Sequence, residues 1–133
     1  MSIEAYFQDL LAAIKEMPNV HTSDVALDKR GPQAGLIRGD VQFADGSLLH
    51  FRELVDLESE QARQMYSYHY QRSGTSLVFR YDDTPHYPEL PNFPHHKHSG
   101  GEENVLSVEA PDLRKALAEI KDLLGTEGQM PKG

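Results

Sequence analysis

Two short turn signals, each between runs of alternating polar and apolar residues, constrain the fold of this chain more than any other feature. Asp45-Gly46 favours a tight hairpin, because a type I′ turn needs positive φ at both central positions. Ser73-Gly74 is a second signal of the same kind. Short hairpins force neighbouring strands to run antiparallel, so the segment from Val20 to Phe79 is predicted to form an antiparallel sheet.

A two-residue turn at Asp45-Gly46 predicts that Arg38 faces Glu53 and that Val41 faces His50. The first pair would be an ordinary cross-strand ion pair, contributing about 0.3 kcal/mol if exposed.

The turn at Ser73-Gly74 predicts a hairpin with one aromatic and one polar face, since side chains alternate along a strand. The aromatic face is expected to be core, although alternating tyrosines also suit a platform for stacking bases. On the polar face, His69 is predicted to lie diagonal to Arg80, within reach of long side chains. The predicted pairs are Tyr70 with Leu77, His69 with Val78, Tyr68 with Phe79, Ser67 with Arg80 and Tyr66 with Tyr81, and Asp82 continues the polar face.

Helical periodicity marks both ends of the chain. Apolar residues from Ile3 to Met17 recur at helical spacing, with Ser2 as N-cap and Pro18 as the stop. Pro111 opens a second helix, which Gly125 is expected to end. We therefore predict a single α+β domain over residues 1–125, with an antiparallel sheet of about five strands flanked by an N-terminal and a C-terminal helix. A short strand is expected over 104–108, and a flexible tail over 126–133.

Composition limits the number of domains, the cellular environment and the kinds of surface that we expect for this protein. The 133 residues suit one domain, and the absence of cysteine excludes disulfides and fits a reducing cytoplasm. We expect no membrane span and no signal peptide, because no apolar run is long enough and the N-terminus lacks a basic segment followed by an apolar one. The formal net charge of −8 argues against a surface that attracts nucleic acid everywhere, but a local basic site remains compatible with it.

A long segment from Asp82 to Gly101 contains four prolines and is predicted to be an ordered loop. It carries His86 and the run Pro94-His95-His96-Lys97-His98. Three interpretations stay open. The imidazoles could serve as acid and base in phosphodiester cleavage, they could bind zinc, nickel or copper, or they could be structural. The sequence contains no phosphate-binding glycine loop, no G-x-S-x-G elbow and no H-E-x-x-H helix.

Several motifs resemble the TumE-like toxin family of bacterial and archaeal toxin–antitoxin pairs. The most specific are Y-S-Y-H-Y-Q-R at residues 66–72, L-V-F-R-Y-D-D at 77–83 and P-H-H-K-H at 94–98. The resemblance extends from about Gly35 to Leu124. It implies a toxin partnered by an antitoxin encoded beside it, typically one with a helix-turn-helix domain. By analogy with toxins of similar size, it also suggests cleavage of RNA, alone or on the ribosome.

The leading hypothesis is therefore a metal-independent endoribonuclease toxin, with no cofactor. Its alternative is a non-catalytic module that binds zinc, another divalent metal or a protein through the histidine loop. A metal-dependent nuclease is a third possibility. The expected catalytic residues are His69, Arg80, Asp82, His95, His96 and His98, with Asp82 orienting an imidazole, and the expected substrate-binding residues are Arg72, His86 and Lys97.

Overall fold

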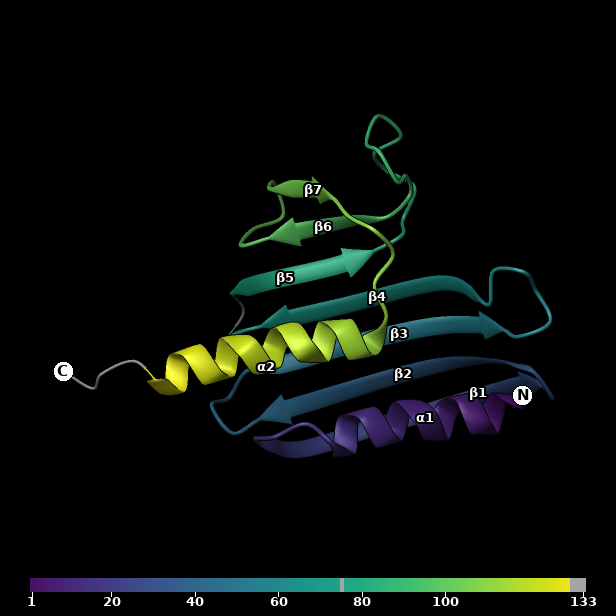
Figure 1. The fold of residues 1–133 in the computed structure, drawn as a ribbon, viewed down its shortest axis with the longest axis horizontal. Helices are drawn as coiled ribbons and strands as arrows, with labels where there is room; N and C mark the ends of the chain where they lie inside the picture. Colours follow the sequence, from purple (N-terminus) through teal and green to yellow (C-terminus); the bar gives the residue numbers. More distant parts are fainter. Residues whose placement is uncertain (75, 130–133) are drawn as a thin grey trace.

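The computed structural model describes the backbone of residues 1–74 and 76–129. These residues form two helices and seven strands (Figure 1). In chain order the elements are α1 (Ile3–Lys15), β1 (Val20–Gly31), β2 (Ala34–Phe43), β3 (Leu48–Asp56), β4 (Arg63–Gln71), β5 (Leu77–Asp82), β6 (His96–Ser99), β7 (Val105–Ser107) and α2 (Leu113–Gln129).

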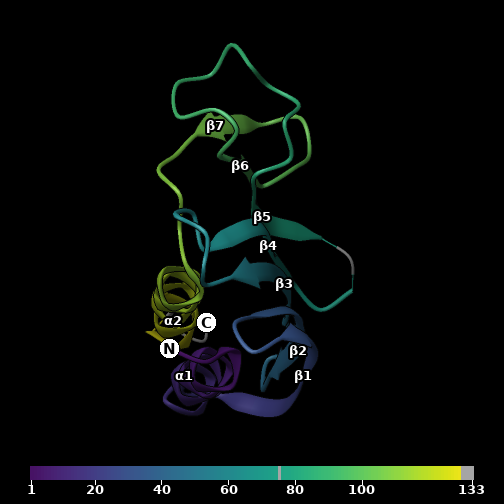
Figure 2. The same ribbon diagram turned by 90° about the vertical axis from the view of Figure 1, so that its right-hand side faces the viewer.

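The strands form a single antiparallel meander in the order β1 to β7, and both helices lie on the same face of it (Figures 1 and 2). The predicted α+β class is confirmed, but the described sheet has seven strands, not about five. The additional pairing includes β6, which lies inside the segment predicted to be a loop and pairs with β5. The prolines end before it, so His96 to Ser99 are free to donate to the ladder.

The helix boundaries follow their caps. Ser2 caps α1 by accepting a hydrogen bond from the Ala5 amide at 3.1 Å, as the sequence predicts. In α2 the Asp112 carboxylate accepts from the Lys115 amide at 2.8 Å. The predicted end at Gly125 is wrong, because α2 continues to Gln129. Of the predicted tail, residues 130–133 lie outside the described part of the chain.

The first hairpin has a longer turn than the sequence suggested. The Phe43 amide donates to Ser47 O at 2.9 Å, and Gly46 has φ of 87°, which gives a three-residue loop. The register therefore shifts by one residue: Arg38 faces Arg52 rather than Glu53, and Val41 faces Leu49 rather than His50. Because side chains alternate with a period of two, this one-residue shift moves Glu53 from the predicted exposed face to the core.

The second hairpin is shifted by two residues from the predicted register, which leaves its faces unchanged. Tyr68 pairs with Tyr81 and His69 pairs directly with Arg80. The aromatic face is buried as predicted, with the exception of Leu77. A shift in the strand register between Tyr70 and Gln71 moves Leu77 out of line with this face. Val78 packs against the core there instead. The buried aromatic residues of this face are Tyr66, Tyr68, Tyr70, Phe79 and Tyr81.

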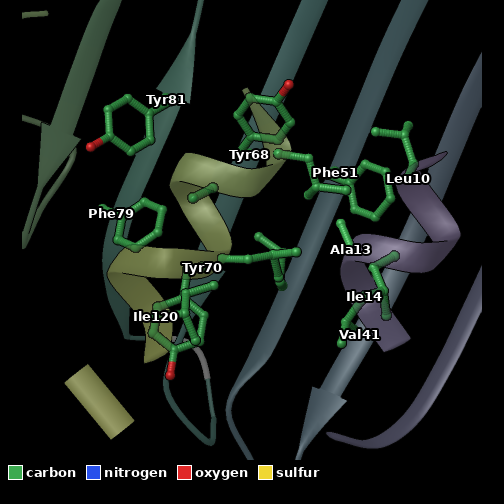
Figure 3. Packing of buried hydrophobic residues seen from close by; sticks show 14 of the residues in the cluster. Leu10, Ala13, Ile14, Val41, Phe51, Tyr68, Tyr70, Phe79, Tyr81 and Ile120 are labelled. Carbon is green, nitrogen blue, oxygen red and sulfur yellow. The ribbon is translucent and has the colours of Figure 1, made fainter. Parts of the chain in front are cut away.

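The core fills the space between this aromatic face and the two helices (Figure 3). Leu10 and Ile14 of α1 pack over β2 and β3, while Ile120 of α2 packs beside the tyrosines of β4. The Phe51 ring lies across Gly39 on the neighbouring strand, and a Cβ there would come within 2.3 Å of it. Because Tyr66, Tyr68 and Tyr70 are buried in this core, they do not form an exposed platform on which bases could stack.

A carboxylate, Glu53, is fully buried within this core. Tyr6 of α1 donates to Glu53 Oε1, and Tyr68 donates to Oε2 at 2.7 Å. Arg63 donates to the Tyr68 hydroxyl at 2.8 Å, so a charge-bearing network ties α1 to β3 and β4. Burial raises the pKa of Glu53 above its ordinary value, although the hydrogen bonds from Tyr6 and Tyr68 oppose the shift.

We predict that Glu53→Gln changes the pH dependence of stability. With the folded pKa raised, the unfolded carboxyl ionises first, so the wild type loses stability as pH rises from about 4.5 toward the folded pKa. Glutamine does not ionise. Urea unfolding at a series of pH values should therefore show the free energy of unfolding of the variant improving relative to wild type as pH rises. A difference that is flat with pH would contradict the prediction.

Candidate functional site

The sheet face opposite the helices carries two parallel rows of polar side chains. Cross-strand partners in an antiparallel sheet lie side by side, so each row follows directly from the register. One row crosses β2 to β6 through Arg38, Arg52, Ser67, Asp82 and His96. We call it the Asp82 row. The second, the Arg80 row, runs through Asp40, His50, His69, Arg80 and His98.

The β6 ends of the two rows form a compact centre of Asp82, His96 and His98. His96 Nε2 lies 2.9 Å from Asp82 Oδ1, and one ligand-type atom from each of the three residues lies within 4.8 Å of the others. The three residues are 7%, 1% and 4% exposed, respectively. His96 is therefore the imidazole that the Asp82 carboxylate contacts, and an orienting role for Asp82 stays a prediction.

The proline-containing segment between β5 and β6 covers these two histidines through its Tyr87 ring. The Tyr87 ring packs edge-on against His96 with centroids 4.9 Å apart, and it also contacts His98 at 6.2 Å. A pocket of about 470 Å³ remains beside the centre. Its lining includes all three members of the centre together with Arg52, Arg80 and His86.

Arg80 is the cation nearest to the centre. Its Nε donates to Asp82 Oδ2 at 3.0 Å, and its Nη2 donates to the exposed Glu102 at 2.7 Å. The bond from Arg80 lowers the pKa of Glu102. The guanidinium is therefore held on one side by the buried Asp82 carboxylate and on the other by the solvent-exposed Glu102 carboxylate.

His69 lies beside Arg80 in the Arg80 row but does not line the pocket. Its ring is 6.0 Å from that of His50, centroid to centroid. Partial burial lowers the pKa of His69, and the nearby Arg80 and His50 lower it further. The lowered pKa favours the neutral imidazole of His69, which can accept a proton.

Three of the residues expected at the site lie elsewhere. His95 contacts the Tyr66 hydroxyl at 2.9 Å and stacks on that ring, on the helix side of the sheet. Lys97 also points to the helix side, because it alternates with His96 and His98, and it bonds Glu119 of α2 at 2.7 Å. Arg72 follows β4 in the turn to β5, about 17 Å along the strand from Ser67.

Two arginines of the open face, Arg38 and Arg52, are not among the site residues predicted from the sequence. Arg38 and Arg52 are both exposed and directly opposite one another, and neither forms a salt bridge within the described part of the chain. Arg52 lines both the pocket beside the centre and a second hollow over β1 to β3. A three-residue loop assumed at Asp45-Gly46 predicts that Arg38 faces Arg52. The two-residue turn expected from the sequence predicts Glu53 at that position instead.

These features define an α+β protein with one sheet face covered by helices and the other carrying a polar, pocketed surface. The family model described as Toxin TumE matches residues 10–124, which is most of the chain. The chain therefore belongs to the TumE toxin family, as its motifs predicted, and family membership implies an antitoxin partner. No curated protein and no solved structure matches the chain. Neither of the described helices has the length and apolar character that crossing a membrane requires.

We predict that His96→Ala destabilises the fold by about 2 kcal/mol, because it removes a partner of the buried Asp82 carboxylate. The neighbouring variant His95→Ala is the matched control. It removes a contact on the helix side and should cost less than about 1 kcal/mol. Urea unfolding in EDTA measures both. Equal costs for the two variants would contradict the placement of His96 in a buried polar centre.

Proposed function

We propose that this toxin acts by cleaving RNA, which binds along the open face and reacts at the pocket beside Asp82, His96 and His98. The observation that carries the proposal is the Arg38–Arg52 pair, which leads along the Asp82 row toward that pocket. Like charges directly opposite each other on a sheet destabilise it. A bound phosphate would remove the repulsion, and it would place the RNA backbone at the pocket mouth.

Local charge supports this proposal despite the net charge of −8. Arg38, Arg52 and Arg80 all lie on the open face, and the first two have no carboxylate partner among the described residues. Phosphate contacts depend on such local cations rather than on the overall balance. Arg80 would become available to phosphate if the exposed Glu102 carboxylate moved away.

The pocket also offers the groups that phosphodiester cleavage requires: proton-transfer groups and cations that stabilise the developing charge. Arg80 would stabilise the phosphate, and the centre of Asp82, His96 and His98 would be the reacting centre. His86, which lines the pocket, would transfer protons there, and His69, which lies beside Arg80 outside the lining, is a second candidate. His95, Lys97 and Arg72 are not part of this proposal, since their side chains or positions lie away from the pocket.

The antitoxin is proposed to carry a helix-turn-helix domain, on the strength of the motif resemblance alone. Its binding would abolish toxicity, and a binding surface over the pocket would do so most directly. A ribosome is proposed as an alternative setting for the cleavage, so the cleavage assay uses ribosomes as well as free RNA.

The decisive test is cleavage of RNA by purified protein, with and without ribosomes, together with growth arrest on expression. Wild type and His21→Ala, which alters an exposed histidine of β1, should cleave equally. Asp82→Asn and His98→Gln should lose at least about a hundredfold in rate, as removal of a central catalytic group does. If wild type leaves RNA intact in both settings, the proposal fails, and a non-catalytic binding module is favoured.

RNA affinity should respond separately to the arginine pair. We predict that Arg52→Gln weakens binding to all RNA sequences and lowers the slope of log K against log salt by about one. The same variant should be more stable than wild type by a few tenths of a kcal/mol, roughly, because the repulsion with Arg38 is removed. Arg114→Gln on α2 is the control for a lost positive charge on the helix side. Equal weakening by both variants would contradict binding on the open face.

A further inference from the structure

The two histidines of the centre, His96 and His98, each have one ring nitrogen fixed by a backbone carbonyl. His96 Nδ1 lies 3.0 Å from Pro94 O, and His98 Nδ1 lies 2.8 Å from Glu102 O. A carbonyl oxygen only accepts, so each Nδ1 must carry the proton. In the neutral imidazole this leaves the lone pair of each ring on Nε2.

The lone pair of His96 then points at another acceptor. Its Nε2 is 2.9 Å from Asp82 Oδ1, which also accepts from the Thr84 amide at 3.1 Å. Two acceptors at this distance need a cation between them, either a proton or a metal ion. The ligand atoms of His98 and Asp82 belong to the same cluster, within 4.8 Å, so a metal ion would gain three donors rather than two.

The surroundings of these donors resemble the outer layer of a metal site. Metal-binding imidazoles typically donate their second N–H to a carbonyl, and metal-binding carboxylates are themselves held by hydrogen bonds. Here two carbonyls hold the imidazoles, and Arg80 Nε holds Asp82 Oδ2 at 3.0 Å, which leaves Oδ1 turned toward His96. Such partners keep the donor atoms in place before any metal arrives.

We propose that Asp82, His96 and His98 bind one divalent transition metal ion of the zinc type. Two imidazoles and a carboxylate suit zinc and its first-row neighbours, whereas magnesium prefers an all-oxygen shell. Three protein ligands leave at least one coordination position open, which is typical of catalytic rather than structural zinc. The open position would face the pocket that all three residues line.

Metal binding here depends only on the geometry of the three side chains, whereas its use in RNA cleavage rests on the function proposed above. A metal in this place would supply Lewis-acid chemistry at the phosphate. The two histidines would then be ligands, and proton transfer would fall to other groups such as His86 and His69. This differs from the metal-independent mechanism expected from the sequence.

The test is metal binding by the full chain without a histidine tag, after EDTA treatment and removal of the chelator. Calorimetric titration with ZnCl₂ should give one ion per chain and raise the thermal midpoint, since the ion binds the folded state. Titration with CoCl₂ should give the visible absorption of a nitrogen- and oxygen-ligated ion. Asp82→Asn and His98→Gln should weaken binding at least about tenfold, and His95→Ala should leave it unchanged.

The outcomes separate the two proposals. Absence of one-to-one binding by the folded wild type would overturn the metal site and leave only the direct contact between His96 and Asp82. Equal weakening by His95→Ala would also overturn it, since that result means diffuse binding by the histidine-rich segment. Circular dichroism in EDTA checks that each variant is folded. If one of Asp82→Asn and His98→Gln does not fold, the other is enough to test the metal site. If RNA cleavage persists in EDTA, the result supports the proposed function and shows that cleavage does not need the metal ion. Binding of one zinc ion per chain without RNA cleavage would support the metal site and contradict the proposed nuclease activity.

Discussion

The alternation of side chains along β4, β5 and β6 is the constraint on which the rest of this structure depends. Tyrosines on every second position of β4 must enter the core, and this forces Ser67 and His69 onto the opposite face. The same rule places Arg80 and Asp82 of β5 there. Because adjacent strands are hydrogen-bonded in register, burying the aromatic side chains also aligns the polar residues into continuous rows.

Two buried carboxylates show how the protein places charge inside its fold. Glu53 lies on the helix side, where tyrosine hydroxyls satisfy its oxygens and burial favours its protonated form. Asp82 lies on the other face, held by Arg80 and facing His96. The first carboxylate links α1 to the sheet. The second is beside an open pocket, so it is the one that a substrate or an ion can reach.

The proline-containing segment has a structural role that its composition alone did not indicate. Much of it, including His86, is exposed to solvent, but its Tyr87 ring contacts His96 and His98 on the sheet. The shell around the imidazoles is therefore partly aromatic, which excludes water from one side of the centre. Electrostatic interactions are stronger in such surroundings than in bulk water, and that applies to a bound phosphate as much as to a bound cation.

The sequence by itself determined the fold class, the aromatic core face and the association of Arg80 and Asp82 with the histidine segment. These predictions rest on local periodicity, which needs only neighbours along the chain. Tertiary structure decided the rest. The exact length of one turn set the register that opposed Arg38 to Arg52, and strand formation by β6 sent Lys97 away from the pocket. The signal at Asp45-Gly46 does not distinguish a two-residue from a three-residue loop, and the pairing of β6 with β5 depends on contacts outside the segment itself.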